Sequence, residues 1–379
     1  MSRRTGAQTT GPTRAYSAGA FGYSFPAIRG VQAGREYFVS MCPLRLIPKI
    51  FLFNEEELVP ELRAQRVLNK ARVPEITRYL LRNRSNYTFS ALTASLDGNV
   101  KFIPTDGGAE GEMLGRLSIA MDTRFVINDG QHRRAAIEAA IRDAPDLADE
   151  SIAVVFFLDS GLQRSQQMFA DLNRHAIRPS TSLGVLYDQR DPDGQLVKQW
   201  LLEDGLFRSL TEMEKSTLAE RSAKLFTLSA LYHASQALLT PFRDLDSPDR
   251  LQLLRAFWNH VAEQLPDWQR VASKEISAAS VRRGSLTSHG IALQSLGRAG
   301  AALLVADPVH WKKRLKALQS IDWRRSNTKL WEGRALVGGR VSKASTNVAL
   351  TTNIIKKALQ LPLSAEDKRI ERAKKDGES

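Results

Sequence analysis

The periodicity of the apolar residues changes near residue 191, and this change constrains the possible folds more than any other feature. Before it, short apolar runs typical of strands alternate with helical patterns. After it the chain has helical periodicity, at residues 214–239, 249–265 and 288–305, with prolines between the segments. We therefore expect an α/β domain and then a helical one. The expected divisions are a disordered tail at 1–22, the α/β domain at 23–191, a helical domain at 192–306, a basic helical region at 307–362 and a charged tail at 363–379.

Two hairpins are expected in the α/β domain. Residues 23–44 predict two strands around the Ala33-Gly34 turn. Residues 87–97 predict a strand that turns at an Asp-Gly pair and returns through residues 100–104.

Further along, the pattern predicts a β-α-β unit. The segment "SIAVVFFL", residues 151–158, is apolar throughout and should lie in the middle of a sheet. A strand at 124–128 and a helix at 133–143 precede it, so we expect a right-handed crossover between the two strands. Two more helices are expected at 55–69 and 73–83.

The composition excludes several classes of protein. No stretch approaches the roughly 18 consecutive apolar residues of a membrane span, and the N-terminus lacks the apolar segment of a secretory signal. A single cysteine, Cys42, excludes an intramolecular disulfide framework and a cysteine-based zinc site. None of His233, His260, His289 and His310 has a partner at the spacing of an HExxH site, so no metal site is expected. We expect a cytoplasmic protein.

Positive charge is concentrated near the C-terminus. The net charge is +13, and residues 307–362 carry 12 Lys or Arg against 3 Asp or Glu. Such a region typically faces a polyanion, most often nucleic acid; the alternative is a solvated surface. The candidate DNA contacts are Lys312, Lys313, Arg314, Lys316, Arg324, Arg325 and Arg340 in this region, and Arg66, Lys70 and Arg72 on an earlier cationic helix face.

The stretch "FVINDGQHRRAAIEAAI", residues 125–141, places cations where a strand becomes a helix. Asn128 or Asp129 is expected to cap the helix, and Gly130 to allow the sharp turn. A helix N-terminus attracts anions, whereas cations there oppose the helix dipole. We therefore favour a phosphate site over solvated first-turn residues, although the chain has no P-loop motif. The candidate phosphate contacts are Asp129, Gly130, Gln131, His132, Arg133 and Arg134.

Several segments together resemble a known family. "DGQHRRAAI" is similar to the signature of the DGQHR-domain proteins of the ParB/sulfiredoxin-like superfamily. "YSFPAIRGVQAGREYFVSMCPLRLIPKIF", "LRAQRVLNKARVPEI", "FSALTAS" and "RSQQMFADLNRHAIRPSTSLGVLYD" resemble, in order and spacing, the DndB family of the DNA phosphorothioation (Dnd) systems. The resemblance is dense over residues 23–191. It implies a ParB/sulfiredoxin-like mixed-sheet fold in which the turn contacts nucleotide phosphates.

The resemblance also implies a function. Proteins of this family are DNA-binding negative regulators of the sulfur-modification genes and are not the sulfur-transfer enzymes. The implied partner is double-stranded DNA, at promoters or modification sites; other Dnd proteins and a second copy of the chain are further candidates, and no membrane is expected. The alternative is a nucleotide-binding NTPase or a nucleotide-gated DNA clamp that uses Gln131, His132 and Arg133 on the phosphates. Its cofactor would be ATP or another nucleoside triphosphate.

Two further features allow two interpretations each. In the superfamily the segment around Asn173 and Arg178 often returns to the nucleotide pocket, but cations near a helix C-terminus also simply compensate the dipole. Cys42 is either a buried apolar thiol or a redox-sensitive regulatory thiol whose thiolate is favoured by Arg45 and Lys49.

Overall fold

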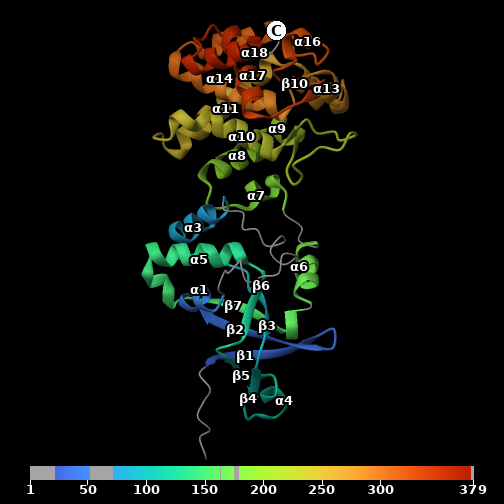
Figure 1. Ribbon diagram of the computed structural model, residues 1–379. Coiled ribbons are helices and arrows are strands. Elements are labelled where there is room, and N and C mark those ends of the chain that lie inside the picture. The colour runs from blue at the N-terminus through green and yellow to red at the C-terminus, as the bar shows by residue number, and fades with distance from the viewer. Residues whose placement is uncertain (1–21, 52–70, 163, 175–178, 377–379) are drawn as a thin grey trace, which may run out of the picture. The chain divides into compact units, whose positions relative to one another are not determined.

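The structure, a computed structural model, consists of a sheet-containing unit and a helical unit (Figure 1). It confirms the expected fold class, a mixed-sheet α/β domain followed by a mainly helical one. Among the residues it describes, no helix is both long enough and apolar enough to cross a membrane. The described residues are 22–51, 71–162, 164–174 and 179–376, so the helix expected at 55–69 lies outside them.

The boundary between the units falls earlier than expected. Contacts divide the chain into residues 1–177 and 178–379, whereas the sequence predicts a boundary at 191. The difference arises because the segment before 191 packs with the helical unit. Ser182 is fully buried there, and its hydroxyl bonds to Ser229 Oγ at 3.2 Å.

The first unit is built on a seven-stranded sheet with the strand order β4-β5-β1-β2-β7-β3-β6. Neighbouring strands are antiparallel except for β3 and β7, which run parallel. As expected, β1 and β2 form a hairpin, and the apolar strand β7 lies inside the sheet. The strands are β1 (Gly22–Gln32), β2 (Arg35–Pro43), β3 (Leu92–Asp97), β4 (Val100–Pro104), β5 (Leu114–Ala120), β6 (Arg124–Asp129) and β7 (Ser151–Leu158).

The second expected hairpin is wrong, because β3 and β4 do not pair. β3 pairs with β6, and β4 pairs with β5, so the four strands form one antiparallel ribbon that bends where Gly98 and Asn99 join β3 to β4. The two halves of this ribbon occupy opposite ends of the strand order. Two residues span at most about 7 Å, so the sheet must curl back toward itself.

The expected β-α-β unit is also wrong. Helix α5 (Gln131–Asp143) does connect β6 to β7, but β3 lies between these strands, antiparallel to β6 and parallel to β7. β6 and β7 are therefore antiparallel to each other, and the handedness rule for parallel strands does not apply. The sequence pattern predicts that β6 lies next to β7, but β3, a strand from earlier in the chain, occupies that position in the sheet.

Helices cover the core of the first unit. α3 packs against α5, and α6 lies beside β6. The core contains Phe38 and Phe156 from the sheet and Leu80 and Ile137 from α3 and α5, all nearly inaccessible to solvent. The helices are α1 (Ile47–Ile50), α3 (Val73–Arg82), α4 (Gly108–Gly111), α5 and α6 (Ser165–Arg174), with 3-10 helices at Leu44–Leu46, Pro145–Asp149 and Ser160–Leu162.

A single hydrophobic core runs through the second unit. It extends from Val185 to Leu361, so the expected helical and basic regions are not packed separately. Two short two-stranded sheets accompany the helices: β8 (Thr211–Glu212) with β9 (Phe226–Thr227), and β10 (Leu336–Val337) with β11 (Arg340–Val341). The helices are α7 (Thr181–Tyr187), α8 (Pro192–Glu203), α9 (Gly205–Leu210), α10 (Leu228–Leu239), α11 (Ser247–Gln264), α12 (Asp267–Ala272), α13 (Ala278–Gly284), α14 (Gly290–Ala306), α15 (Trp311–Leu315), α16 (Thr328–Trp331), α17 (Ser345–Ala358) and α18 (Ala365–Asp376), with 3-10 helices at Thr240–Phe242 and Lys316–Ser320.

Two expectations for this unit are wrong. The helix expected at 214–239 begins only at Leu228, because the Arg282 guanidinium binds carbonyl oxygens of residues 219–224 and holds that segment as an irregular loop. The segment expected to be a charged tail instead forms α18, which the buried Glu371 ties to Arg334 by two bonds of 2.7 and 2.8 Å.

Helices α10 and α14 approach each other very closely. A methyl group on Gly297 of α14 would come within 2.0 Å of the Ala234 carbonyl oxygen of α10. Three residues further along α14, a methyl group on Gly300 would come within 2.3 Å of the Phe257 ring and within 3.0 Å of Leu238 Cδ1 of α10. The two contacts advance in the same direction along both helices, so α10 and α14 run parallel.

Candidate functional site

The strand, glycine turn and helix expected at 125–141 are confirmed. β6 ends at Asp129 and α5 begins at Gln131. Between them Gly130 has a φ of +104°, and a methyl group there would come within 2.3 Å of Leu92 Cδ2. The position therefore requires glycine for both its backbone conformation and its space.

The expected helix cap is wrong. Gly130 occupies the N-cap position, and α5 begins without a hydrogen bond from a capping side chain. Asn128 is instead fully buried: its Nδ2 donates to Ser95 Oγ at 2.8 Å, and its Oδ1 accepts from Ser165 Oγ at 2.7 Å. These bonds join β6 to β3 and to the start of α6. The only sequence signal for them is a polar residue in an apolar strand.

Arg133 binds groups of its own unit. Its Nη1 donates to the carbonyl oxygens of Ser90 and Ala91 at 2.8 and 3.1 Å, and its Nη2 donates to Asp129 Oδ2 at 2.6 Å. The side chain is only 15% exposed. Arg133 and Asp129 thus hold the turn against the segment that leads into β3.

Arg134 is buried more deeply, with a side chain that is 8% exposed. Its Nε donates to the Phe51 carbonyl oxygen at 2.9 Å and its Nη2 to the Pro48 carbonyl oxygen at 3.0 Å, while its Nη1 donates to the Glu138 carboxylate. The guanidinium therefore binds the segment around α1. Contact with a phosphate would require breaking these bonds.

His132 and Arg72 are the other basic side chains at the start of α5. Burial lowers the pKa of His132, the nearby Arg72 guanidinium lowers it further, and Asp129 raises it. Arg72 is exposed and occupies the N-cap position of α3, so the charges at the two helix starts interact. Gln131 and His132 are partly exposed. Asn173 belongs to α6, but its side chain and the residues Arg66, Lys70 and Arg178 lie outside the described part of the chain.

Cys42 belongs to the core of the first unit. It lies in β2 opposite Ile152 and is fully buried. Burial raises the pKa of its thiol to about 12, and the hydrogen bond with Ser40 offsets only part of this effect. Arg45, which would favour a thiolate under the alternative interpretation, pairs with Asp149. This geometry supports a buried apolar thiol, because thiolate formation is what makes a cysteine reactive.

One group of cations in the basic region is bonded within the unit. Arg314 Nη2 donates to the carbonyl oxygens of Leu359 and Gln360 at 2.5 and 3.1 Å, and so binds the C-terminal end of α17. Such bonds reduce the number of donors left for a partner. The same group contains Arg324 with Asp322, Arg325 with the Gly339 carbonyl oxygen, Arg334 with Glu371, Lys356 with Asp367, and Lys357 with Glu371.

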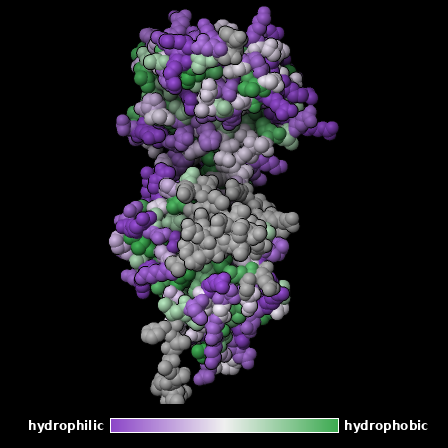
Figure 2. Space-filling view, in the orientation of Figure 1, coloured by the Kyte–Doolittle hydropathy of each residue, from purple (hydrophilic) through white to green (hydrophobic). Residues whose placement is uncertain are grey.

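A second group is exposed and has no acidic partner among the described residues. Three of its members follow one another on α15 and the adjoining 3-10 helix, where Lys312 Nζ lies 5.7 Å from the centre of the Trp311 ring. Figure 2 shows hydrophilic residues over much of the visible face of the helical unit. The Trp rings of this region are buried, so they are not available to stack on exposed bases. The group consists of Lys312, Lys313, Lys316, Lys329, Arg340 and Lys343.

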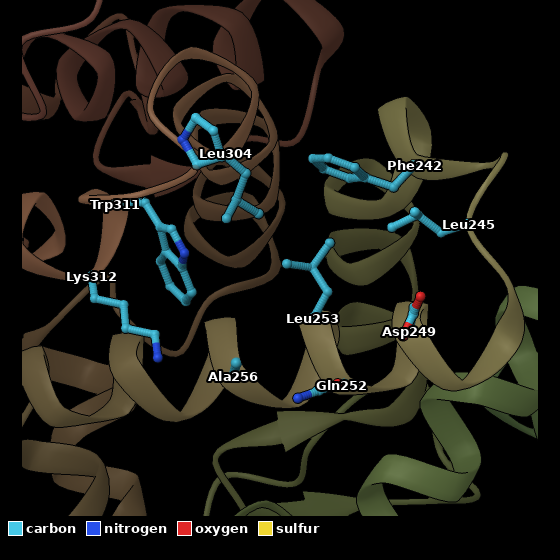
Figure 3. Close-up of a pocket in the computed structure, with 10 residues that line it drawn as sticks. Phe242, Leu245, Asp249, Gln252, Leu253, Ala256, Leu304, Trp311 and Lys312 are labelled. Carbon is cyan, nitrogen blue, oxygen red and sulfur yellow. The ribbon is translucent and has the colours of Figure 1, made fainter.

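A cavity of about 370 Å³ opens beside Lys312 (Figure 3). Leu253 of α11, Leu304 of α14 and Trp311 of α15 contribute to its walls, and Lys312 and Asp249 are its charged side chains. With mainly apolar walls and one charge of each sign, this cavity does not resemble a phosphate site.

Comparison with known proteins gives one result. Residues 25–362, nearly the whole chain, match the DndB family, which is described as DNA-sulfur modification-associated. The match extends beyond residues 23–191 through the helical unit and its basic region. No curated protein and no solved structure matches the chain.

Proposed function

The chain belongs to the DndB family of DNA-sulfur modification-associated proteins, and on this premise we propose that it is a DNA-binding accessory protein that represses the genes of DNA phosphorothioate modification. The helical unit makes the DNA contact through the exposed lysines of α15. Membership of the family supports a role in DNA sulfur modification. The distribution of positive charge supports contact with the phosphates of DNA.

The observation that carries this proposal is the group of exposed cations that have no acidic partner in the described part of the chain. Several arginines of the same region bind carbonyl or carboxylate oxygens of their own unit. The charge left for a partner therefore comes largely from Lys312, Lys313 and Lys316. Lysine binds phosphate as a point charge, and phosphate contacts position a protein on DNA without reading its sequence.

Replacing Lys312, Lys313 and Lys316 together by Gln tests this contact. These side chains are exposed, and none of them makes a hydrogen bond or an ion pair with another described residue, so the fold should be unaffected. Affinity for a DNA duplex should fall by about tenfold or more at moderate salt, measured by fluorescence anisotropy. The matched control replaces Lys198, Lys215 and Lys274, which lie elsewhere in the same unit, and should bind nearly normally. An equal loss of affinity in both triple variants would show that only the net charge of the protein matters, and it would contradict a specific contact at Lys312, Lys313 and Lys316.

A reporter gene tests the regulatory part. Driven by the promoter of the modification genes, it should be repressed by the wild-type protein and released by the α15 triple variant. Full repression by that variant would place the DNA contact elsewhere. If the wild-type protein binds the promoter but does not repress it, the regulatory role is contradicted.

A second candidate function is nucleotide binding at the start of α5. The helix start has no capping side chain, its first turn contains His132, and the Arg72 guanidinium lies close to that imidazole. Helix N-termini bind phosphate. Gln131 and the backbone at Gly130 would join His132 and Arg72. ATP or CTP should then raise the melting temperature without DNA, and phosphate release would reveal turnover. Loss of the shift in His132→Ala, with the shift kept when exposed Arg142 of the same helix is replaced by Ala, would support this site; no shift in the wild type would eliminate it.

A further inference from the structure

Helices α14 and α17 (Figure 1) begin side by side in the second unit. Ser295 Oγ of α14 donates to the Val348 carbonyl oxygen of α17 at 3.2 Å. Five residues before Ser295 in the chain is Gly290, and five residues before Val348 is Lys343, in the segment that leads into α17. Gly290 lies against the side chain of Lys343. The contacts advance in the same direction along both helices, so the helices run parallel. Their positive dipole ends therefore meet in one place.

Neither helix start has a capping side chain. The N-cap residues, His289 for α14 and Ala344 for α17, make no side-chain cap bond, and neither first turn contains an acidic residue. Other helices of the same unit are capped: α8 by Asp191, α10 by Thr227 and α11 by Asp246. The first N–H groups of α14 and α17 are thus without the acceptor that these other helices have.

Lys343 brings an ammonium group to this junction. Its Nζ lies so close to α14 that a methyl group on Gly290 would come within 2.6 Å of it. Partial desolvation of the ammonium group lowers the pKa of Lys343, although much of the residue stays exposed to solvent, and no carboxylate offsets that effect. An ammonium group at the positive end of a helix is unfavourable by itself. An anion bound between the two would make the arrangement favourable.

The hydroxyl group of Ser288 is a second, independent donor that lacks an acceptor near this junction. The residue is 6% exposed, and its Oγ has no hydrogen-bond partner within the described residues. Leaving a buried hydroxyl unpaired is costly. Ser288 stands directly before the N-cap residue His289, so its unpaired hydroxyl belongs to the segment that leads into α14 and offers a donor to a ligand bound there.

The titratable groups around the junction are basic. Burial lowers the pKa of His233 on α10, and Lys343 lowers it further. Burial also lowers the pKa of His289; Arg325 and the Arg282 side chain act in the same direction, and only the bond to the Arg282 carbonyl oxygen opposes them. No carboxylate contributes to the pKa of His233, His289 or Lys343.

We propose that the junction of α14 and α17 is a binding site for a phosphate group. The phosphate oxygens accept hydrogen bonds from Lys343 Nζ, Ser288 Oγ and the first N–H groups of the two helices. Lys343 is exposed, and His289 and Gly290 are partly exposed, so the junction is open to solvent. The phosphate comes from a DNA backbone or from a free phosphate-containing ligand, since both present the same oxyanion. The inference does not rest on the proposed function, because phosphate binding is measured without DNA.

Calorimetric titration of the full chain with inorganic phosphate, with chloride at equal ionic strength as the reference, tests the site. The wild type should bind, and Lys343→Gln and Ser288→Ala should bind about tenfold or more weakly, because each loses a hydrogen bond to a charged ligand. Without phosphate, Lys343→Gln should melt like the wild type and Ser288→Ala at the same temperature or higher, because neither side chain has a hydrogen bond within the described residues and the buried Ser288 hydroxyl is unpaired. Lys198→Gln on α8 is the control and should bind normally. Equal affinity in all four proteins, or no binding beyond that of chloride, would overturn the proposal.

A short DNA duplex distinguishes the two sources of the phosphate. Displacement of inorganic phosphate from the wild type by the duplex identifies a backbone phosphate as the ligand. Phosphate that stays bound at saturating duplex identifies a free ligand. If the protein binds no DNA but its phosphate binding depends on Lys343, the proposed DNA function fails and this site stands.

Discussion

The start of α5 in the first unit and the starts of α14 and α17 in the second unit have the same ingredients but use them differently. All three lack a capping side chain and have cations close by. At α5 the donors of Arg133 and Arg134 reach oxygen atoms of their own unit, whereas Lys343 reaches none among the described residues. A cation beside a helix start thus stabilises the fold when the chain supplies acceptors for its hydrogen bonds. When the chain supplies no acceptor, the cation is available to bind an external anion.

The largest expected effect comes from Arg134→Ala, which tests the structural side of this comparison. The variant leaves the carbonyl groups of Pro48 and Phe51 and the carboxylate of Glu138 without their donor. We expect a loss of about 3 kcal/mol in the stability of the first unit, because two carbonyl groups each lose a hydrogen bond from a charged donor, at about 1.5 kcal/mol apiece. All six Trp lie in the second unit, so hydrogen exchange in α5 peptides, rather than Trp fluorescence, measures this loss.

The matched variant is Arg142→Ala. Arg142 is exposed at the other end of α5, and its loss should change stability by less than about 0.5 kcal/mol. If Arg134→Ala were equally mild, the arginines of α5 would not be part of the fold, and the comparison would fail.

A somewhat smaller effect is expected from Gly130→Ala. The new methyl group would overlap Leu92, and the backbone conformation is one that alanine avoids. We expect a loss of about 2 kcal/mol or more by hydrogen exchange. Gly34→Ala is the control for backbone strain alone: its φ is +71°, but nothing lies within 4 Å of the added methyl group. It should cost about 1 kcal/mol, and equal losses at the two positions would contradict the steric argument.

Arg334 is a cation of the second unit whose acceptor, the carboxylate of Glu371, belongs to the chain. The stability that this pair contributes should depend on pH. Burial alone would raise the pKa of Glu371, but hydrogen bonds from Arg334 and Asn353 lower it to about 2. A lowered carboxyl pKa stabilises the fold above the ordinary value near 4.5, and this stability is lost as the pH falls toward 2. Hydrogen exchange in α18 should therefore accelerate in acid. Glu371→Gln and Arg334→Met should weaken this pH dependence; an unchanged dependence in both would refute the role of the pair.

Much of the first unit could be predicted because its signals are local. Gly130 between an apolar strand and a helix predicts the turn, and the uninterrupted apolar run of β7 predicts its interior place in the sheet. The order of the strands could not be predicted in this way. The bend at Gly98 looks like a hairpin turn in the sequence, and only pairing with distant strands shows that β3 and β4 separate.

The roles of the cations were harder to predict, because their partners are distant in the chain. Arg134 binds carbonyl groups more than eighty residues earlier, and Arg314 binds the end of α17 about 45 residues later. Charge and periodicity say nothing about such partners. The position of Lys343 at the start of α14 likewise follows from the parallel packing of two helices that are separate in sequence.

The salt dependence of DNA binding tests most directly the claim that the unpaired cations of the second unit, and not the α5 turn, contact DNA. Each lost phosphate contact lowers the slope of log K against log salt by about 0.9. The Lys312, Lys313 and Lys316 triple variant should therefore lose about 2.7 from the slope, whereas a variant with Arg72→Ala and His132→Ala should keep the wild-type slope. A wild-type slope in the triple variant, with a reduced slope in the α5 variant, would contradict the account.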